Sequence, residues 1–235
     1  KISSGWSIDL VCNPPNKRLR AGHFCHAFRY TKDRELSDVL RETFQLNSLY
    51  PLIKPLENQS CLNALNENTA LGHGLNKHLA PRLSRLVEEI RETLGFEEKV
   101  SFFVANEPIK GAWISGGVTP GGENYVTLTS ELIRALSDDE LRSVIGHEIG
   151  HALFNTNDIN LLLNVAYDGE DSSPSISLDQ LLSTWKKCVE FSADRVGLVA
   201  CGCKVAAINA LYRVSTGLKP EDTGFVVEDY LDALD

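Results

Sequence analysis

Two histidines separated by three residues are the strongest chemical signal in the sequence. Residues 147–151 have the sequence His-Glu-Ile-Gly-His. On an α-helix, residues four apart share one face and lie about 5–6 Å from each other, so His147 and His151 can bring imidazole nitrogens to a single metal ion. Two metal ligands would then come from one turn of helix.

Glu148 follows the first of these histidines and lies one step further around the helix. It is poorly placed to coordinate the same ion as its neighbours, but it can hold the water molecule at the open position of a zinc site. We therefore predict that Glu148 is a general base. The alternative is a helix with two histidines by chance, and average composition gives this five-residue pattern in about one of a hundred such chains.

A catalytic zinc ion usually has three protein ligands, so a third must come from elsewhere in the chain. Glu190 and Asp194 lie four residues apart in an otherwise apolar stretch with a helical pattern. Carboxylates on such a face are costly unless they are paired or bound to metal. One of them can be the third ligand while the other accepts a hydrogen bond from a ligand histidine. A solvated helix face is the alternative.

The pattern around residues 147–151 predicts how a helix would hold them. The sequence from Ser137 to Glu140 is typical of a capping box, so we expect a helix to begin there. Gly146 and Gly150 each cost about 1 kcal/mol of helix propensity relative to alanine. Close packing of another element against this helix would explain both glycines.

The remaining pattern favours an α+β fold that is mostly helical with a small β-sheet. Short runs of β-branched and aromatic residues predict strands at 100–105, 112–115 and 125–129. Apolar periodicity predicts helices at 75–94, 176–200, 204–214 and 222–234. We expect two units, an N-terminal helical appendage over residues 1–70, which packs on the rest or covers it, and a main domain over residues 71–235.

Composition excludes some partners and favours a soluble protein. The net charge of −9 and the lack of a long basic cluster argue against a nucleic-acid partner. No apolar run approaches the roughly 18–20 residues that a membrane-spanning helix needs, so we expect no integral membrane segment. Six cysteines without a Cys-x-x-Cys pair favour a reducing compartment, and we expect a cytoplasmic protein, with a periplasmic or membrane-peripheral location left open.

Two segments, residues 140–151 and residues 190–195, resemble the HtpX-like and CAAX-prenyl-endopeptidase-like family of gluzincin zinc peptidases. The likeness covers roughly residues 75–215. It implies a zincin-like metallopeptidase domain with a bound Zn²⁺, one per chain. The extended metzincin pattern is absent, since Phe154 and Asn157 stand where that class has glycine and a third ligand.

The resemblance assigns a role to each matching residue. It implies that His147, His151 and Glu190 bind zinc, that Glu148 is the base, and that Asp194 supports a ligand histidine.

The resemblance also implies a strand that binds substrate. Family members carry an Asn-Ala-aromatic segment there, and Gly111, Ala112 and Trp113 stand at these positions here. The first position departs from the family pattern, so the orientation of the substrate is less well determined by sequence than the metal site.

These patterns together predict a zinc-dependent metalloendopeptidase. A zinc-bound water activated by Glu148 would hydrolyse the bonds of a peptide or unfolded-protein substrate. The alternative is a zinc-retaining chaperone-like or interaction module whose peptidase activity is absent or blocked by residues 1–70. The intact Glu148 argues against it, because a structural site does not need a base.

Several other residues could take part in chemistry. Oxyanion stabilisation could come from Tyr212, Arg213 or Tyr230. The segment His23-Phe-Cys-His26 could bind metal or cap the zinc, although ordinary packing is the simpler interpretation. The sequence Cys-Gly-Cys at 201–203 is typical of the end of a helix.

Overall fold

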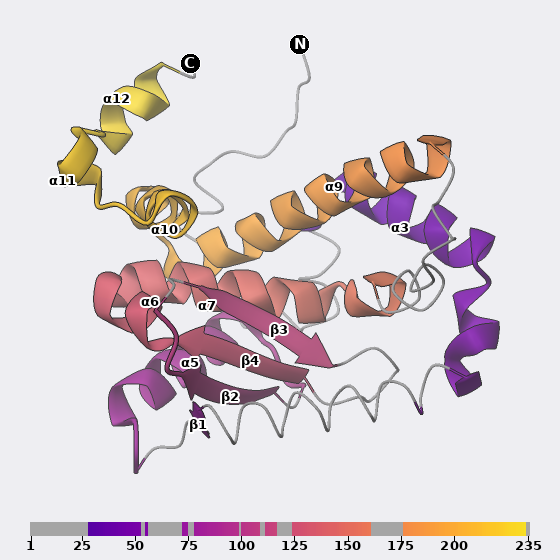
Figure 1. The fold of residues 1–235 in the computed structure, drawn as a ribbon, viewed down its shortest axis with the longest axis horizontal. Helices are drawn as coiled ribbons and strands as arrows, with labels where there is room; N and C mark the ends of the chain where they lie inside the picture. The colour runs from indigo at the N-terminus through magenta and orange to yellow at the C-terminus, as the bar shows by residue number, and fades with distance from the viewer. Residues whose placement is uncertain are drawn as a thin grey trace.

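The structure is a computed structural model that describes residues 28–52, 55, 72–74, 78–98, 100–108, 111–116, 124–160 and 176–233. The main helices are α3 (Thr31–Thr43), α5 (Pro81–Leu94), α6 (Ser130–Ala135), α7 (Asp138–Leu153), α9 (Ile176–Cys201), α10 (Lys204–Thr216), α11 (Pro220–Thr223) and α12 (Val227–Asp232). The strands are β1 (Gly72–Gly74), β2 (Val100–Ala105), β3 (Ala112–Gly116) and β4 (Asn124–Thr129) (Figure 1). The fold is therefore α+β and mostly helical, as predicted.

The described strands form one mixed sheet with the order β1-β2-β4-β3. β2 and β4 are parallel, with Phe102 opposite Val126, while β3 and β4 are antiparallel, with Ile114 opposite Val126. The three predicted strands are confirmed. β1 was not predicted, because three residues that include two glycines carry no strand pattern. Among the described strands β3 forms the edge of this sheet, and it lies against α7. An edge that no described strand covers is thereby close to the predicted catalytic helix.

Three glycines allow α7 and α9 to pack closely against each other. A Cβ atom on Gly146 would lie 2.4 Å from the Cβ of Ala200, and one on Gly150 would lie 2.9 Å from the Cα of Ala193. On the facing helix, a Cβ on Gly197 would lie 2.5 Å from the carbonyl oxygen of Ser143. The predicted close packing against α7 is confirmed, and α9 is the element that packs there.

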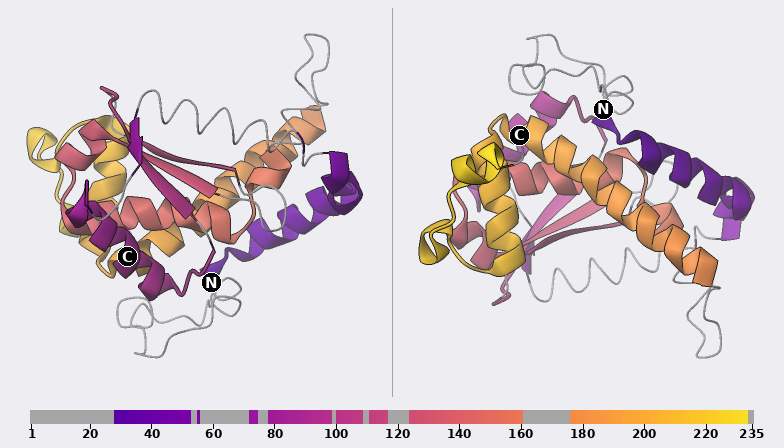
Figure 2. Two further views of the ribbon diagram at one scale, coloured as in Figure 1. Left: turned by 90° about the horizontal axis from the view of Figure 1, so that it is seen from below. Right: turned by 90° about the horizontal axis from the view of Figure 1, so that it is seen from above.

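Two apolar clusters hold the helices in place. The larger joins α5, the sheet, α7 and the C-terminal part of α9, and it includes Leu86, Ile90, Val126, Leu141, Ile145, Ile149 and Val196. The smaller joins α3 to the N-terminal part of α9 through Leu40, Leu46, Ile159, Leu182, Trp185 and Val189. The view from above in Figure 2 shows α3 lying beside α9. α9 therefore takes part in both clusters.

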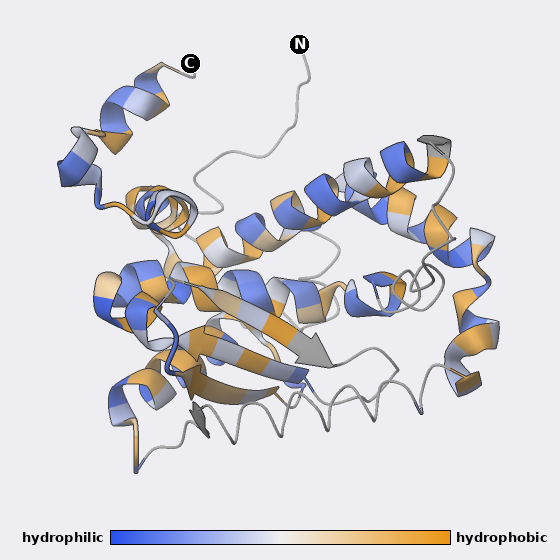
Figure 3. Cartoon of the chain, viewed as in Figure 1, coloured by the Kyte–Doolittle hydropathy of each residue, from blue (hydrophilic) through white to orange (hydrophobic). Residues whose placement is uncertain are grey.

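The hydropathy of α9 fits this double role. Apolar and polar residues are both distributed along its length (Figure 3). None of the described helices is both long and apolar enough to cross a membrane.

The C-terminal region differs from the prediction in one respect. A single helix was expected over residues 222–234, but two short helices, α11 and α12, occupy this region. Gly224 adopts a left-handed conformation, with φ of 70°, and ends α11. The predicted end of α9 at the Cys-Gly-Cys segment is confirmed, since Gly202 has a φ of 66° and the helix stops at Cys201. The division into two units at residue 70 stays a prediction.

Candidate metal centre

The start of α7 is fixed by a capping box. The Ser137 hydroxyl accepts a hydrogen bond from the backbone N–H of Glu140 at 3.3 Å, and the Glu140 carboxylate accepts one from the backbone N–H of Ser137 at 2.7 Å. The predicted cap is thus present. Arg213 of α10 adds an ion pair, with its Nε 3.1 Å from Glu140 Oε1. These contacts set the position of α7 two turns before its histidines.

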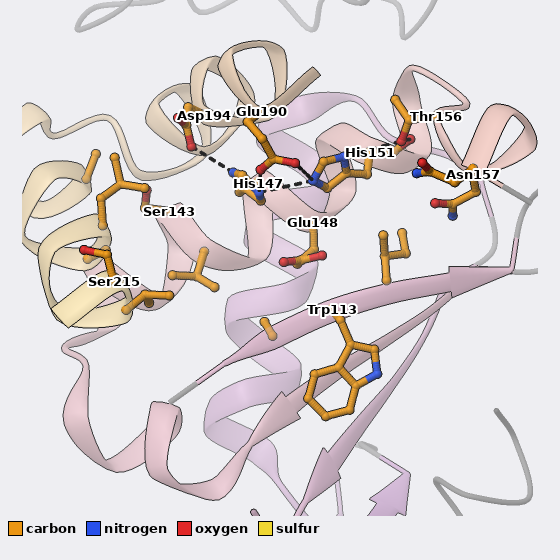
Figure 4. Close-up of a pocket in the computed structure, with 18 residues that line it drawn as sticks. Trp113, Ser143, His147, Glu148, His151, Thr156, Asn157, Glu190, Asp194 and Ser215 are labelled. Carbon is orange, nitrogen blue, oxygen red and sulfur yellow. Dashed lines mark hydrogen bonds and ion pairs between the residues drawn. The ribbon is translucent and has the colours of Figure 1, made fainter. Parts of the chain in front are cut away.

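Three predicted ligand atoms meet between α7 and α9. His147 Nε2 lies 3.2 Å from His151 Nε2 and 3.3 Å from Glu190 Oε2, and His151 Nε2 lies 3.8 Å from Glu190 Oε1 (Figure 4). Ligand atoms about 2.0–2.1 Å from a tetrahedral ion lie roughly 3.3 Å from one another. The donor set of two imidazoles and one carboxylate therefore fits the size and the chemistry of a zinc site.

Each histidine has a second contact that orients its ring. His147 Nδ1 lies 2.9 Å from Asp194 Oδ1, and His151 Nδ1 lies 3.4 Å from the hydroxyl oxygen of Thr156. In both rings the Nε2 atom is thereby left to face Glu190. No sequence pattern indicated Thr156, which is buried and follows His151 by five residues. The position just beyond the end of α7 was the signal that could have indicated it.

The acidic and basic side chains in this cluster shift one another's proton affinities. Burial would lower the pKa of His147, but hydrogen bonds to Asp194 and Glu190 and the nearby negative charges raise it to about 10. Burial, together with the charge of His147, lowers the pKa of His151 to about 4. The hydrogen bond from His147 lowers the pKa of Glu190. The carboxylates thus favour one positive charge at the point where the rings meet.

Glu148 lies on the side of α7 that faces the sheet. Its side chain is buried and is directed into the space between the two histidines and β3 (Figure 4). Burial raises its pKa to about 7, while the charge of His147 and a backbone hydrogen bond from Ile114 act in the opposite direction. A carboxyl group with this proton affinity can both accept and release a proton near neutral pH.

These groups line one cavity of about 550 Å³. Ala112, Trp113 and Ile114 of β3 form one wall. α10 contributes an apolar wall made of Ala207, Ala210, Leu211 and Val214. The cavity joins the metal cluster to both walls, so a bound molecule would contact all three.

The three residues predicted to bind substrate divide into two groups. Ala112 and Trp113 line the cavity, whereas Gly111 is not among its lining residues. The backbone N–H of Gly111 donates to the Thr129 hydroxyl and its carbonyl accepts from the Thr129 N–H, both at 3.0 Å. Gly111 is therefore engaged with the start of α6, and its role in substrate binding stays a prediction.

The suggested oxyanion-stabilising residues lie outside this cavity. Arg213 pairs with Glu140 and donates to the carbonyl of Ala135, and Tyr212 stacks on Phe225. Tyr230 belongs to α12 and is not among the lining residues either. The uncharged polar residues that do line the cavity, none of them predicted, are Ser143, Thr156, Asn157, Asn160 and Ser215. No pattern at these positions distinguishes them from ordinary helix and turn residues.

The segment at residues 23–26 lies outside the described residues. Another buried carboxylate close to His151 in the sequence, Asp158, is paired with Arg41 and is not part of the ligand cluster.

The chain is similar to a family of peptidases and to several known proteases. The family model described as Peptidase family M48 matches residues 77–167. The chain is 39% identical over 85 residues to a protease HtpX homolog of Pyrobaculum calidifontis, covering 36% of this chain and 24% of that protein. It is 27% identical over 168 residues to a protease HtpX homolog of Sulfurihydrogenibium sp., covering 57% of this chain and 56% of that protein.

A more extended match is found in a plant protein. The plastoglobule-localized metallopeptidase 48, chloroplastic, of Arabidopsis thaliana is 23% identical over 207 residues, which cover 86% of this chain and 58% of that protein. The aligned part of the chain thus spans between about a quarter and three fifths of the length of these relatives. No solved structure matches the chain. The family match over residues 77–167 and the repeated likeness to HtpX homologs therefore support the prediction of an HtpX-like metallopeptidase of family M48.

Proposed function

We propose that the chain is a zinc-dependent endopeptidase. In this proposal His147, His151 and Glu190 hold one zinc ion, Glu148 is the general base, and Asp194 orients the first histidine. The observation that carries the proposal is the cluster of three ligand atoms, all within 4.8 Å of one another, beside a buried carboxyl group in the same cavity. This arrangement suits metal-assisted hydrolysis of a peptide bond.

The protein groups divide the chemical work in a simple way. When bound, the ion would supply a Lewis acid that polarises the peptide carbonyl and makes a nearby water molecule more acidic. Glu148 would accept a proton from the attacking water at its carboxylate and then deliver it to the leaving nitrogen. Asp194 would keep the proton of His147 on Nδ1, so that Nε2 stays available as a ligand.

The shape of the cavity supports an extended peptide as substrate. β3 is an edge strand, and a peptide in extended conformation can pair with such an edge through main-chain hydrogen bonds. Trp113 is 40% exposed at this edge. The apolar wall from α10 would then receive an apolar side chain close to the scissile bond. Only a flexible or unfolded chain can adopt this pose, which is why we propose peptides and unfolded proteins as substrates.

The rival function is an interaction or chaperone-like module that keeps zinc but does not hydrolyse peptides. The buried position of Glu148 beside the ligand cluster favours the peptidase. Burying a carboxyl group is costly, and a purely structural zinc site would not need one there. We also propose a reducing, cytoplasmic location, which rests on the irregular cysteine spacing and on the free thiols of Cys188, Cys201 and Cys203.

A peptide library tests the proposal. The protein would be freed of metal with a chelator, incubated with the library, and then incubated again after one equivalent of zinc is added. We expect cleavage only after zinc is added, with large apolar residues enriched at one position beside the cut. Equal cleavage without metal would contradict the proposal, and stable zinc binding with no cleavage of any peptide would favour the rival.

A further inference from the structure

A buried polar cluster joins α3 to the turn of α9 that carries Glu190 and Asp194. At its centre is Asp33, which is fully buried. Arg29 donates two hydrogen bonds to its carboxylate, at 2.7 and 3.0 Å, and the hydroxyl groups of Ser192 and Ser37 donate at 2.6 and 2.9 Å. Trp185 of α9 donates to Ser37 at 2.9 Å. We call these five residues the Asp33 cluster.

The chain just before α3 also contacts the ligand-bearing turn of α9. The backbone N–H of Tyr30 donates to the Ser192 hydroxyl at 3.0 Å. The ring of Tyr30 packs edge-on against Phe191, with centroids 5.8 Å apart, and the Arg195 guanidinium lies 5.1 Å from the centre of the same ring. Residues 191, 192 and 195 are therefore all held by Tyr30, within the stretch that carries Glu190 and Asp194.

A second polar cluster joins the end of α3 to the segment that follows α7. Arg41 donates to both carboxylate oxygens of the buried Asp158 at 3.0 Å and to the carbonyl oxygen of Asn155 at 2.6 Å. The Tyr50 hydroxyl donates to Asp158 at 3.3 Å. We call Arg41, Asp158, Asn155 and Tyr50 the Asp158 cluster. Thr156, whose hydroxyl contacts His151, lies between Asn155 and Asp158 in the sequence.

Each cluster is thus adjacent to one side of the candidate metal centre. Ser192 lies between Glu190 and Asp194 in the sequence, and Asp158 lies two residues beyond Thr156. A buried carboxylate with several charge-assisted hydrogen bonds allows few alternative arrangements, because a displaced partner would leave a charge unpaired. Leu40 and Trp185 also belong to the apolar cluster that joins α3 to α9. In both clusters, residues of α3 contact partners that lie more than 100 positions away in the sequence.

We propose that α3 positions the metal-binding residues of both helices, with Ser192 setting the ligand-bearing turn of α9 and Arg41 setting the segment that orients His151. These are positioning residues, since none of them reaches the ligand atoms. The inference rests on the proposed zinc site. It goes beyond that site because it makes α3 part of the metal centre's support, although α3 belongs to the sequence predicted to be an appendage.

Two serines of the Asp33 cluster provide a matched comparison. Ser192 and Ser37 are both fully buried and both donate to Asp33, but only Ser192 belongs to the ligand-bearing turn. Ser192→Ala and Ser37→Ala would be compared by zinc competition with a chromophoric chelator and by the visible spectrum of the cobalt(II)-loaded protein. We expect both variants to melt at lower temperature. Only Ser192→Ala should weaken zinc binding, by about tenfold, which is the lower end for supports of metal ligands, and shift the cobalt spectrum.

A second pair of variants tests the Asp158 cluster. Its result is informative even if the Ser192→Ala or Ser37→Ala variant does not fold. Arg41→Lys keeps the charge but loses the two-point contact with Asp158. Arg142→Lys is its control, since Arg142 has similar exposure and pairs with Glu89 of α5 and Asp139 of α7, neither of which belongs to the metal cluster. We expect weaker zinc binding and a changed cobalt spectrum for Arg41→Lys alone.

The outcomes separate the two proposals. If the unmodified protein binds no zinc, the proposed function fails, and the role of α3 fails with it. If the unmodified protein binds zinc and each variant behaves like its control in zinc affinity and cobalt spectrum, α3 only stabilises the fold and the inference is overturned.

Discussion

His147 Nδ1 lies 2.9 Å from Asp194 Oδ1, across the interface between α7 and α9. A carboxylate at this position holds the proton of the imidazole on Nδ1 and directs the lone pair of Nε2 toward Glu190. The same helix, α9, therefore carries both a proposed ligand and the group that orients another one. The close α7–α9 contact permitted by the glycines makes this pairing possible.

The first prediction concerns the two carboxylates of α9. Glu190→Ala should abolish high-affinity zinc binding, whereas Asp194→Asn should weaken it by about 10- to 100-fold, because the amide is a poorer acceptor but leaves the ligands in place. Zinc competition with a chelator measures both. Asp179→Asn, a charge removal in the first turn of the same helix, is the control and should have no effect. The reverse order of severity would show that the roles are assigned wrongly.

Removal of either histidine should have an equally specific effect. We expect His147→Ala and His151→Ala each to lose bound zinc, because only two of three ligands remain. Metal analysis of the purified variants measures this loss. His78→Ala removes an exposed histidine outside the cluster and should keep one zinc per chain. Stoichiometric zinc in a variant lacking both His147 and His151 would rule out this metal site.

The close packing of α7 against α9 predicts that one added methyl group at Gly197 lowers the free energy of unfolding. In Gly197→Ala the new Cβ would lie 2.5 Å from the carbonyl oxygen of Ser143, so the helices must separate. Although alanine is about 1 kcal/mol better than glycine in a helix, we expect a net destabilisation of roughly 1–3 kcal/mol by urea denaturation. Gly111→Ala is the control, since nothing lies within 4 Å of its added Cβ. An unchanged free energy of unfolding in Gly197→Ala would contradict the described contact.

The Asp33 cluster predicts how stability depends on pH. Burial alone would raise the pKa of Asp33, but hydrogen bonds from Arg29, Ser192 and Ser37 and the charge of Arg29 outweigh it and lower the pKa below 3.8. A carboxylate with a lowered pKa stabilises the folded state above its unfolded pKa, and this contribution disappears as the pH falls through the folded value.

The corresponding measurement is urea denaturation of the unmodified protein and of Asp33→Asn over a pH series. We expect the difference in free energy of unfolding to be constant above about pH 5 and to shrink below about pH 4. A difference that grows toward acid pH would mean that Asp33 is protonated in the folded protein.

Local patterns predicted the features that depend on neighbours in sequence. The capping box at Ser137 and Glu140 and the central strands follow from such patterns, and the structure has them. Helical spacing predicted that His147 and His151 would share one face, and the family resemblance implied that Glu190 would join them. The three ligand atoms do lie together, while their role as zinc ligands stays a prediction.

Features that depend on distant contacts were not predictable in this way. The contact between Thr156 and the ring of His151 depends on how the chain turns after α7 ends, and distant contacts fix that turn. The contact between Asp33 and Ser192 joins residues 159 positions apart, and nothing in either local sequence indicates the other. Arg213 was a candidate for catalysis because of its charge, but its partner Glu140 directs it to the start of α7.

The central claim, that Glu148 acts as a base beside a bound zinc ion, is tested most directly by Glu148→Gln. Zinc content and hydrolysis of a library-derived peptide would be measured on the same preparation. The control is Glu131→Gln, which changes a partly exposed carboxylate of α6. We predict one zinc per chain and a loss of turnover of about 10²-fold or more in Glu148→Gln, with both properties unchanged in the control. Turnover at the level of the unmodified protein in the zinc-loaded Glu148→Gln variant would contradict the account.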